Sequence, residues 1–336
     1  MLVDRLQRPL EDLRISVTDR CNFRCTYCMP LAEYEWIHKS HILTFEEVAR
    51  VARVFADLGV RKIRLTGGEP LVRVDLPRLV AQLAAIDSLE DLCLTTNGAL
   101  LGEQAQPLAD AGLRRVTVSL DTLRPERFRE ITQRGDLEPV IEGIAAAKRA
   151  GLDPIKINAV IERGVNEDEI LDLVDFALRE SADVRFIEFM DVGNANHWNL
   201  SKLVPKKEIL DTIATRYRLE PATTERGGAP AVSYRVEGAV DIGVIASVTE
   251  PFCGGCTRAR LTADGKLVTC LFSDDGFDLR SLLRESSDDA VLSAEIKRVW
   301  TNRQDRFSEH RLSAMDSSAG YQPAGRRKIE MIRLGG

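Results

Sequence analysis

Apolar positions along the first 190 residues alternate between two rhythms. After Thr44, hydrophobic residues recur at intervals of three and four as far as Leu58, and Gly59 follows them. This spacing is typical of a helix that packs on a core and ends at a glycine. A short run with strand character, Lys62-Ile-Arg-Leu-Thr66, comes next. The same succession of helix and strand then repeats.

The repeat predicts a parallel sheet. We expect strands at 62–66, 91–95, 115–119, 155–160 and 184–189, and helices at 76–83, 104–111, 125–131, 140–150 and 167–179. Strands that alternate with amphipathic helices imply right-handed crossovers and a parallel sheet. Six such units are too few for a closed eight-fold barrel. We therefore predict an α/β fold built on an incomplete, six-unit TIM-like parallel barrel.

The rhythm changes beyond Phe189. Residues 194–203 are polar and loop-like, 205–217 are helical, and 223–230 form a linker that contains glycine. Short β runs at 232–236 and 240–245 precede a hairpin that turns at Asp264-Gly265. We expect the barrel to occupy residues 1–219 and a smaller C-terminal α+β domain to occupy residues 220–336.

Composition and charge narrow the possible partners. A chain of 336 residues that is 44% hydrophobic can bury a large core. Its net charge of -6 argues against nucleic acid held by a basic surface and against an anionic membrane. No apolar run approaches a membrane span or the core of a signal peptide, so we expect a cytoplasmic protein. An anionic ligand would need a local cluster of arginine and lysine.

Six of the seven cysteines fall into two groups of three. In the first group, Cys21, Cys25 and Cys28 are separated by three and two residues, and Tyr27 precedes the last thiol. Three thiols can ligate three irons of a four-iron cubane and leave the fourth open, as a catalytic site requires. Zinc ribbons and the common four-cysteine iron-sulfur run have other spacings. The run resembles the signature of radical S-adenosylmethionine (SAM) enzymes.

The second group consists of Cys253, Cys256 and Cys270. A zinc site here would need a fourth ligand, and none of the four histidines has a characteristic spacing, so zinc is the minor alternative. Arg258 and Arg260 lie between these cysteines. On a strand both guanidiniums would point the same way and could clamp a phosphate. Two exposed arginines are the plainer alternative.

Polar residues follow several predicted strands. Thr66-Gly-Gly-Glu-Pro70, Thr95-Thr-Asn-Gly98 and Ser119-Leu-Asp121 occupy the strand ends at which α/β barrels place their active sites. They should converge on one mouth.

Charged residues also interrupt the strands themselves. Lys62, Arg64, Lys156 and Arg185 stand where a buried parallel strand is normally apolar. Burying such charges without partners is costly. Either these strands are partly exposed, or the cavity holds a polyanion such as a triphosphate.

Together these motifs are similar to those of the GTP 3',8-cyclases, the molybdenum cofactor biosynthesis protein A family. The similarity covers essentially the whole chain. It extends to Met29-Pro30 after the first cysteines, to Arg185-Phe-Ile-Glu-Phe-Met190, and to the final Gly335-Gly336. The resemblance implies a lyase that cyclises GTP to (8S)-3',8-cyclo-7,8-dihydroguanosine 5'-triphosphate, the first step of molybdenum cofactor biosynthesis. A 5'-deoxyadenosyl radical would take the ribose 3' hydrogen.

The resemblance also implies residue roles. Two 4Fe-4S clusters would be held, the SAM cluster by Cys21, Cys25 and Cys28, and an auxiliary cluster by Cys253, Cys256 and Cys270. SAM contacts would be Tyr27, Gly68, Ser119 and Met190. GTP contacts would be Arg14, Lys62, Arg64, Thr95, Lys156, Arg258, Ala259 and Arg260. Catalytic roles would fall to Arg185, Gly335 and Gly336.

The implied partners are an electron donor of the flavodoxin or ferredoxin type and the cyclic pyranopterin monophosphate synthase, and the chain would form a homodimer. Two other functions stay open at this point. One is a radical SAM peptide-modifying enzyme with an auxiliary cluster, and the other is a non-catalytic protein stapled by zinc. The seventh cysteine, Cys93, is predicted to be a small core residue.

Overall fold

The computed structural model describes residues 1–31, 33–194, 196–222, 228–315, 321 and 328–335. Its strands are β1 (Asp12–Ser16), β2 (Lys62–Thr66), β3 (Asp91–Thr96), β4 (Arg115–Ser119), β5 (Lys156–Ile161), β6 (Asp183–Glu188), β7 (Leu219–Pro221), β8 (Val232–Val236), β9 (Val240–Ile245), β10 (Arg258–Leu261), β11 (Lys266–Val268) and β12 (Phe277–Asp278). Its helices are α1 (Phe45–Asp57), α2 (Leu76–Ala84), α3 (Leu101–Asp110), α4 (Pro125–Thr132), α5 (Leu137–Arg149), α6 (Ile170–Glu180), α7 (Lys206–Ala214), α8 (Leu279–Glu285), α9 (Asp289–Thr301), α10 (Phe307–Met315) and α11 (Met331–Leu334).

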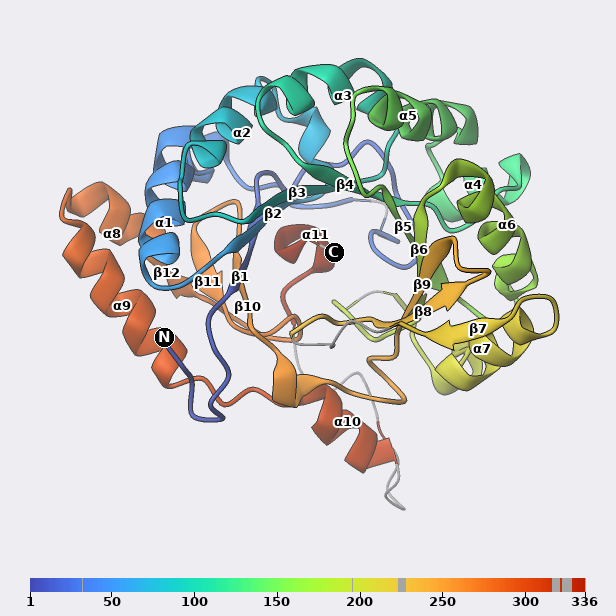
Figure 1. The fold of residues 1–336 in the computed structure, drawn as a ribbon. Helices are drawn as coiled ribbons and strands as arrows, with labels where there is room; N and C mark the ends of the chain where they lie inside the picture. Colours follow the sequence, from blue (N-terminus) through green and yellow to red (C-terminus); the bar gives the residue numbers. More distant parts are fainter. Residues whose placement is uncertain (32, 195, 223–227, 316–320, 322–327, 336) are drawn as a thin grey trace.

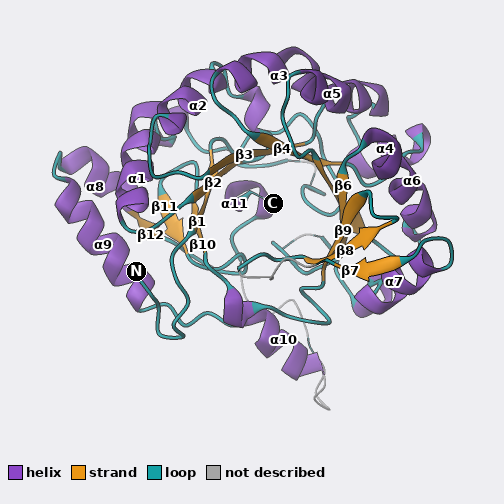
Figure 2. Ribbon diagram, in the orientation of Figure 1, coloured by secondary structure: helices purple, strands orange, loops and turns teal. Residues whose placement is uncertain are grey.

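The described strands form one sheet in the order β12-β11-β10-β1-β2-β3-β4-β5-β6-β9-β8-β7. The central run from β10 to β9 is parallel throughout, whereas the outer strands pair antiparallel. Figure 1 shows that the sheet curves into an open ring with α1 to α6 outside it. Figure 2 separates the inner strands from the outer helices by colour. The prediction of an incomplete parallel barrel is confirmed.

The predicted elements lie close to where the hydrophobic spacing placed them. Thr44 caps α1: its hydroxyl accepts from the Glu47 amide at 3.1 Å, and the Glu47 carboxylate accepts from the Thr44 amide at 2.8 Å. This reciprocal pair fixes the start of the helix. The hairpin predicted at Asp264-Gly265 joins β10 and β11, and Gly265 has a φ of +81°. The linker predicted at 223–230 lies mostly outside the described residues.

Strand β1 was missed by the sequence analysis. Its two apolar residues, Leu13 and Ile15, alternate with Asp12 and Arg14 over only five residues, which is too short a pattern to stand out. It nevertheless holds a central place in the sheet, between β2 and β10.

The C-terminal part of the chain continues the barrel sheet on both sides. Strand β9 pairs in parallel with β6, and β10 pairs in parallel with β1. Helix α9 packs against α1 on the outside. The domain boundary at residue 219 stays a prediction.

The core lies between the sheet and the surrounding helices. Outward-facing strand residues are apolar and fully buried, among them Leu13, Ile15, Ile63, Leu65, Val116 and Val118. The alternate positions of the same strands line the interior and are polar or charged. Of the charges that interrupt the strands, Lys62, Arg64 and Arg185 therefore belong to a cavity wall. In the described part of the chain, no helix has the length and apolarity needed to cross a bilayer.

Candidate active site

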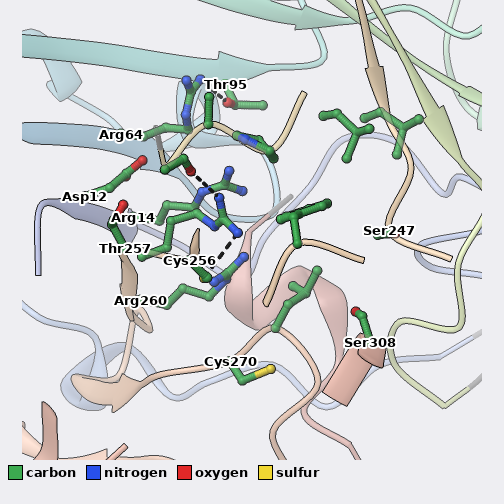
Figure 3. Close-up of a pocket in the computed structure, with 18 of the residues that line it drawn as sticks. Asp12, Arg14, Arg64, Thr95, Ser247, Cys256, Thr257, Arg260, Cys270 and Ser308 are labelled. Carbon is green, nitrogen blue, oxygen red and sulfur yellow. Dashed lines mark hydrogen bonds between the residues drawn. The ribbon is translucent and has the colours of Figure 1, made fainter. Parts of the chain in front are cut away.

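The barrel encloses a cavity of about 1050 Å³. Strands β1 to β6 supply one wall, through Arg14, Arg64, Thr95, Ser119 and Arg185 among others. Cys253, Cys256 and Cys270, which lie in a short 3-10 helix and in loops of the C-terminal part, also line the cavity, and Figure 3 labels Cys256 and Cys270. Charged and polar side chains from both halves of the chain therefore line the cavity, together with apolar ones.

Three arginines lie side by side across adjacent strands. Arg260, Arg14 and Arg64 are register partners on β10, β1 and β2, so their side chains project from the same face. Figure 3 shows Arg14 and Arg260 near Cys256, and Arg64 extending toward Thr95. Arg64 donates to the hydroxyls of Thr95 at 3.0 Å and Thr117 at 3.1 Å. We call Arg260, Arg14 and Arg64 the arginine row.

The arginine row carries more positive charge than its surroundings balance. Burial and the neighbouring Arg260 lower the pKa of Arg14 well below its usual value, although Asp12 opposes the shift. Burial, followed by the charge of Arg258, lowers the pKa of Arg260 to about 10. The Nε atoms of Arg14 and Arg260 are buried and have no hydrogen-bond partner among the described residues. Buried donors of this kind fit an anionic ligand with several acceptor oxygens.

The predicted lysines are already paired with acids. Lys62 lies 3.3 Å from Asp91, which Arg115 also contacts, and Lys156 lies 2.9 Å from Asp183. Acidic partners are a third way to satisfy these charges, besides the exposure or the anion that the sequence predicted, and the Lys62 side chain is also 40% exposed. Asp91 begins β3 and is the register partner of Lys62 on β2. Asp183 begins β6 and is the register partner of Lys156 on β5. Lys156 lies outside the cavity lining, whereas Lys62 is part of it.

The first cysteine group lies on a tight turn. The amides of Cys28 and Met29 both donate to the Cys25 carbonyl, at 3.0 and 2.7 Å. All three thiols are free and partly buried. Burial raises the pKa of Cys21 to about 11 and also raises the pKa of Cys25 and of Cys28 well above the usual value. Thiolates in such surroundings need a compensating positive charge, which a bound metal cluster provides.

The Gly-Gly-Glu loop packs directly on the chain that enters this turn. The Gly68 amide donates to the Thr18 carbonyl at 2.8 Å, and the Glu69 amide to the Arg20 carbonyl at 2.7 Å. A Cβ at residue 68 would overlap the Arg20 carbonyl, so the close approach itself requires glycine. The predicted contact of Gly68 with SAM is a separate matter and stays a prediction.

Glu69 ties this loop to the one after β3. Its buried carboxylate accepts from the Thr96 hydroxyl at 2.7 Å, the Asn97 amide at 2.6 Å and the Leu71 amide at 3.0 Å. Burial raises the pKa of Glu69 to about 7 even though these donors oppose the shift. The strand ends therefore converge as the sequence predicted, and Glu69 fixes their spacing.

Tyr27, Ser119 and Met190 all line the cavity. The Tyr27 hydroxyl donates to Asp121 at 2.7 Å, and the Ser247 hydroxyl donates to the Met190 sulfur at 3.0 Å. Burial raises the pKa of Asp121 to about 6. These three predicted SAM contacts are thus held in one region by neighbouring polar groups.

The second cysteine group has cationic neighbours. Arg258 and Arg303 donate to the Cys256 sulfur, at 3.1 and 3.2 Å. Burial alone would raise the pKa of Cys256, but the charges of Arg258 and Arg303 outweigh it and lower the pKa to about 6. Ala259, between the two predicted arginines, has its side chain in the core. Among the described residues, no three His, Cys, Asp or Glu side chains converge on one point for a single metal ion.

The C-terminal tail enters the barrel. Figure 1 places α11 at the centre of the ring. Met331 lines the cavity, and Gly335 lies against Thr66, where a Cβ would overlap the threonine side chain. Gly335 has a φ of +68°, which also favours glycine. Gly336 lies outside the described residues.

Comparison with known proteins identifies the family. The Radical SAM superfamily model matches residues 15–177, and the Molybdenum Cofactor Synthesis C model matches residues 182–309. GTP 3',8-cyclase of Acidothermus cellulolyticus is 49% identical to this chain, in an alignment that covers 99% of this chain and 98% of the relative. GTP 3',8-cyclase of Staphylococcus aureus (strain JH9) is 45% identical, and the alignment covers 99% of this chain and 98% of the relative. This chain belongs to the GTP 3',8-cyclase family.

Solved structures of another protein have a fold similar to that of this chain. Streptococcus suis SuiB bound to precursor peptide SuiA gives a TM-score of 0.62 at 18% identity, over 86% of this chain and 67% of that chain. SuiB bound to S-adenosylmethionine gives a TM-score of 0.60 at 18% identity, over 78% of this chain and 60% of that chain. At this identity the likeness concerns the fold alone.

Family membership confirms that the chain is a radical SAM enzyme, with SAM and an iron-sulfur cluster as the cofactors of its superfamily. Roles of single residues in this GTP 3',8-cyclase family member stay predictions. The structure adds residues that sequence analysis did not find, chiefly Arg303 and the acids Asp91 and Asp183. No local signal marks Arg303, because it reaches Cys256 from a part of the chain 47 residues away.

Proposed function

We propose that this chain cyclises GTP to (8S)-3',8-cyclo-7,8-dihydroguanosine 5'-triphosphate, the first step of molybdenum cofactor biosynthesis. Its relatives named GTP 3',8-cyclase support the reaction. In the structure, one observation carries the proposal: the arginine row faces the same cavity as the second cysteine group. A nucleotide triphosphate would need such a set of donors.

Two 4Fe-4S clusters suit the two groups of free thiols, because each group offers three ligands and leaves one iron for a small molecule. Cys21, Cys25 and Cys28 would hold the SAM cluster, and Cys253, Cys256 and Cys270 the auxiliary cluster. When bound and reduced, the first cluster with SAM supplies the 5'-deoxyadenosyl radical that takes the ribose 3' hydrogen.

The protein's own part is to hold two ligands in a fixed relation. Tyr27, Gly68, Ser119 and Met190 would bind SAM. Arg14, Arg64 and Arg260 would bind the triphosphate through planar guanidiniums, and Thr95 orients Arg64 by accepting its hydrogen bond. Arg258 would serve both the substrate and the second cluster, since it already contacts Cys256.

Lys62 and Lys156 would reach phosphate only in competition with their acidic partners, Asp91 and Asp183. Arg185 on β6 adds a further, partly buried charge at the cavity wall, where burial and Arg64 lower its pKa to about 10. We assign it to turnover rather than to affinity. Ala259 would contribute through its backbone.

A primary alkyl radical reacts with whatever lies nearest, so orientation and the exclusion of water are part of the function. Helix α11 lies at the centre of the ring, Gly335 lies against Thr66, and this part of the tail would help to complete the enclosure. An electron donor of the flavodoxin or ferredoxin type would reduce the protein, and the cyclic pyranopterin monophosphate synthase would take its product. These partners, the homodimer and the cytoplasmic location stay predictions.

The decisive experiment is an anaerobic assay of the reconstituted protein with GTP, SAM and a chemical reductant. We expect 5'-deoxyadenosine and the cyclised nucleotide to form in equal amounts. SAM cleavage without any GTP-derived product, under conditions in which GTP binds, would overturn the proposal.

A further inference from the structure

A buried ionic cluster lies beside the cavity and has no part in the function proposed above. At its centre is Asp191, which is 2% exposed and follows Met190 in the loop after β6. The Asp191 carboxylate pairs with Arg311 of α10, accepts from the Tyr321 hydroxyl, and lies 2.7 Å from the Lys328 ammonium. Lys328 also donates to the Asp191 carbonyl at 2.6 Å. We call Asp191, Arg311, Tyr321 and Lys328 the Asp191 cluster.

The Asp191 cluster joins segments that are far apart in the sequence. Lys328 begins the described tail segment that continues through α11 to Gly335. Asn194 binds the backbone of Lys328: its side chain accepts from the Lys328 amide at 2.8 Å and donates to the Lys328 carbonyl at 2.6 Å. The Ile329 amide donates to the Ser273 carbonyl at 3.0 Å. The start of the tail is therefore fixed to two loops that border the cavity.

An aromatic pair extends the cluster toward the second cysteine group. Phe272 and Phe307 stack with ring centroids 4.4 Å apart and an angle of 11°. The Arg311 guanidinium lies 5.1 Å from the Phe272 ring, and the Lys328 ammonium 4.9 Å from the Phe307 ring. Phe272 stands two residues after Cys270. The Asp191 cluster thus adjoins Met190, a predicted SAM contact, and through Phe272 it adjoins the loop of Cys270, a predicted ligand of the auxiliary cluster.

The charge balance of the Asp191 cluster shows which of its residues can be changed. One carboxylate faces two positive charges, and the aromatic faces stabilise the excess. Removing Asp191 would leave two buried cations without an anion, which endangers the fold. Removing only the charge of Lys328 leaves the neutral pair Asp191–Arg311 intact. Lys328 can therefore be changed to release the tail while the rest of the core stays in place.

We propose that Asp191 and Lys328 are positioning residues that seat the C-terminal tail, so that closure of the barrel depends on contacts from both cofactor regions. Seated in this way, α11 brings Gly335 against Thr66, at the strand end that leads into the Gly-Gly-Glu loop. The consequence for catalysis rests on the function proposed above, whereas the seating of the tail does not.

Hydrogen exchange tests the seating directly. Lys328→Met is compared with the unchanged protein and with Lys207→Met, in which an exposed lysine whose ionic partner among the described residues is Asp211 is altered in the same way. In the reconstituted protein, we expect amides of residues 329–335 to exchange about tenfold faster in Lys328→Met. Amides of β1 to β6 should be unaffected, and Lys207→Met should match the unchanged protein. Equal exchange in the tail of all three proteins would overturn the proposal.

Product ratios test the consequence. With GTP, SAM and reductant, Lys328→Met should still form 5'-deoxyadenosine but should give several-fold less cyclised nucleotide for each SAM cleaved. The loss should fall on kcat more than on KM for GTP. Lys328→Arg should restore part of the coupling, since it keeps the charge. An unchanged ratio in Lys328→Met would refute the coupling role. An unchanged protein that binds GTP and never cyclises it would refute the proposed function, while the exchange result still decides the seating.

Discussion

The two cysteine groups share a ligand count and differ in their electrostatic surroundings. Cys21, Cys25 and Cys28 are partly buried, and no described arginine or lysine donates to their sulfurs: Arg24 donates to the Cys21 carbonyl, and the Cys21 sulfur accepts from the Phe23 amide at 3.4 Å. Cys256 instead accepts from two guanidiniums. Hydrogen bonds and positive charge on sulfur favour the reduced state of a cluster. The comparison teaches that one chain places two equal sets of thiols in unlike electrostatic surroundings.

Loss of one ligand from each group should separate their roles most strongly. Cys25→Ala is expected to abolish reductive SAM cleavage, because the open-iron site for SAM is lost. Cys256→Ala is expected to leave some uncoupled cleavage and to form no cyclised nucleotide. Chromatography of 5'-deoxyadenosine and nucleotide products measures both. Equal 5'-deoxyadenosine from Cys25→Ala and from the unchanged protein would contradict the assignment.

Iron content tests whether both groups hold cubanes. Anaerobic reconstitution should give about eight irons per chain, and changing all three cysteines of either group to alanine should leave about four. Iron and sulfide analysis with Mössbauer spectroscopy provides the measurement. A zinc site at the second group would instead give about four irons in the unchanged protein, with zinc detected beside them.

The arginines of β10 should affect substrate more than SAM. Arg258→Ala and Arg260→Ala are each expected to weaken GTP binding by about 1 to 3 kcal/mol, the range for losing a charged hydrogen-bond partner. Lysine at either position should restore only part of the affinity, since it lacks the planar fork. Isothermal titration with GTP measures the change, with the exposed Arg129→Ala as control. Unchanged affinity in both variants would mean that the pair does not bind substrate.

The smallest expected effect sharpens the electrostatic contrast itself. Arg303→Met removes one donor from Cys256 and leaves Asp4 paired with Arg8. The auxiliary cluster should then become harder to reduce, by on the order of 60 mV, while the SAM cluster keeps its potential. Redox titration followed by electron paramagnetic resonance distinguishes the two. Equal shifts of both clusters would show that the arginine acts through the fold and not on Cys256.

Local patterns were enough to predict most of the fold. Helix α1 has an apolar stripe and a capping box within its own sequence, so Thr44 to Gly59 could be assigned without any knowledge of neighbours. Strand β1 could not, because five residues with alternating charge resemble a loop. Its identity depends on pairing with β2 and β10, which is a tertiary fact.

The site divides in the same way. The cysteine spacings and the Gly-Gly-Glu loop are contiguous motifs, so the sequence could indicate them. The arginine row results from register between strands whose residues are far apart in the chain. Arg303 and Lys328 act through contacts of 47 and 137 residues in sequence separation, and no periodicity signals such contacts.

The pairing of β10 with β1 and of β9 with β6 has a consequence for the order of assembly. Strand β1 is among the first to leave the ribosome, yet its partner β10 begins at residue 258. The β6 edge of the sheet from β1 to β6 has unpaired backbone groups until β9 is made, and the β1 edge until β10 is made; such edges are templates for association with other chains. Contacts of such long range also slow folding. A fragment that ends at residue 219 should therefore self-associate in size-exclusion chromatography, and the full chain should depend on chaperones during synthesis.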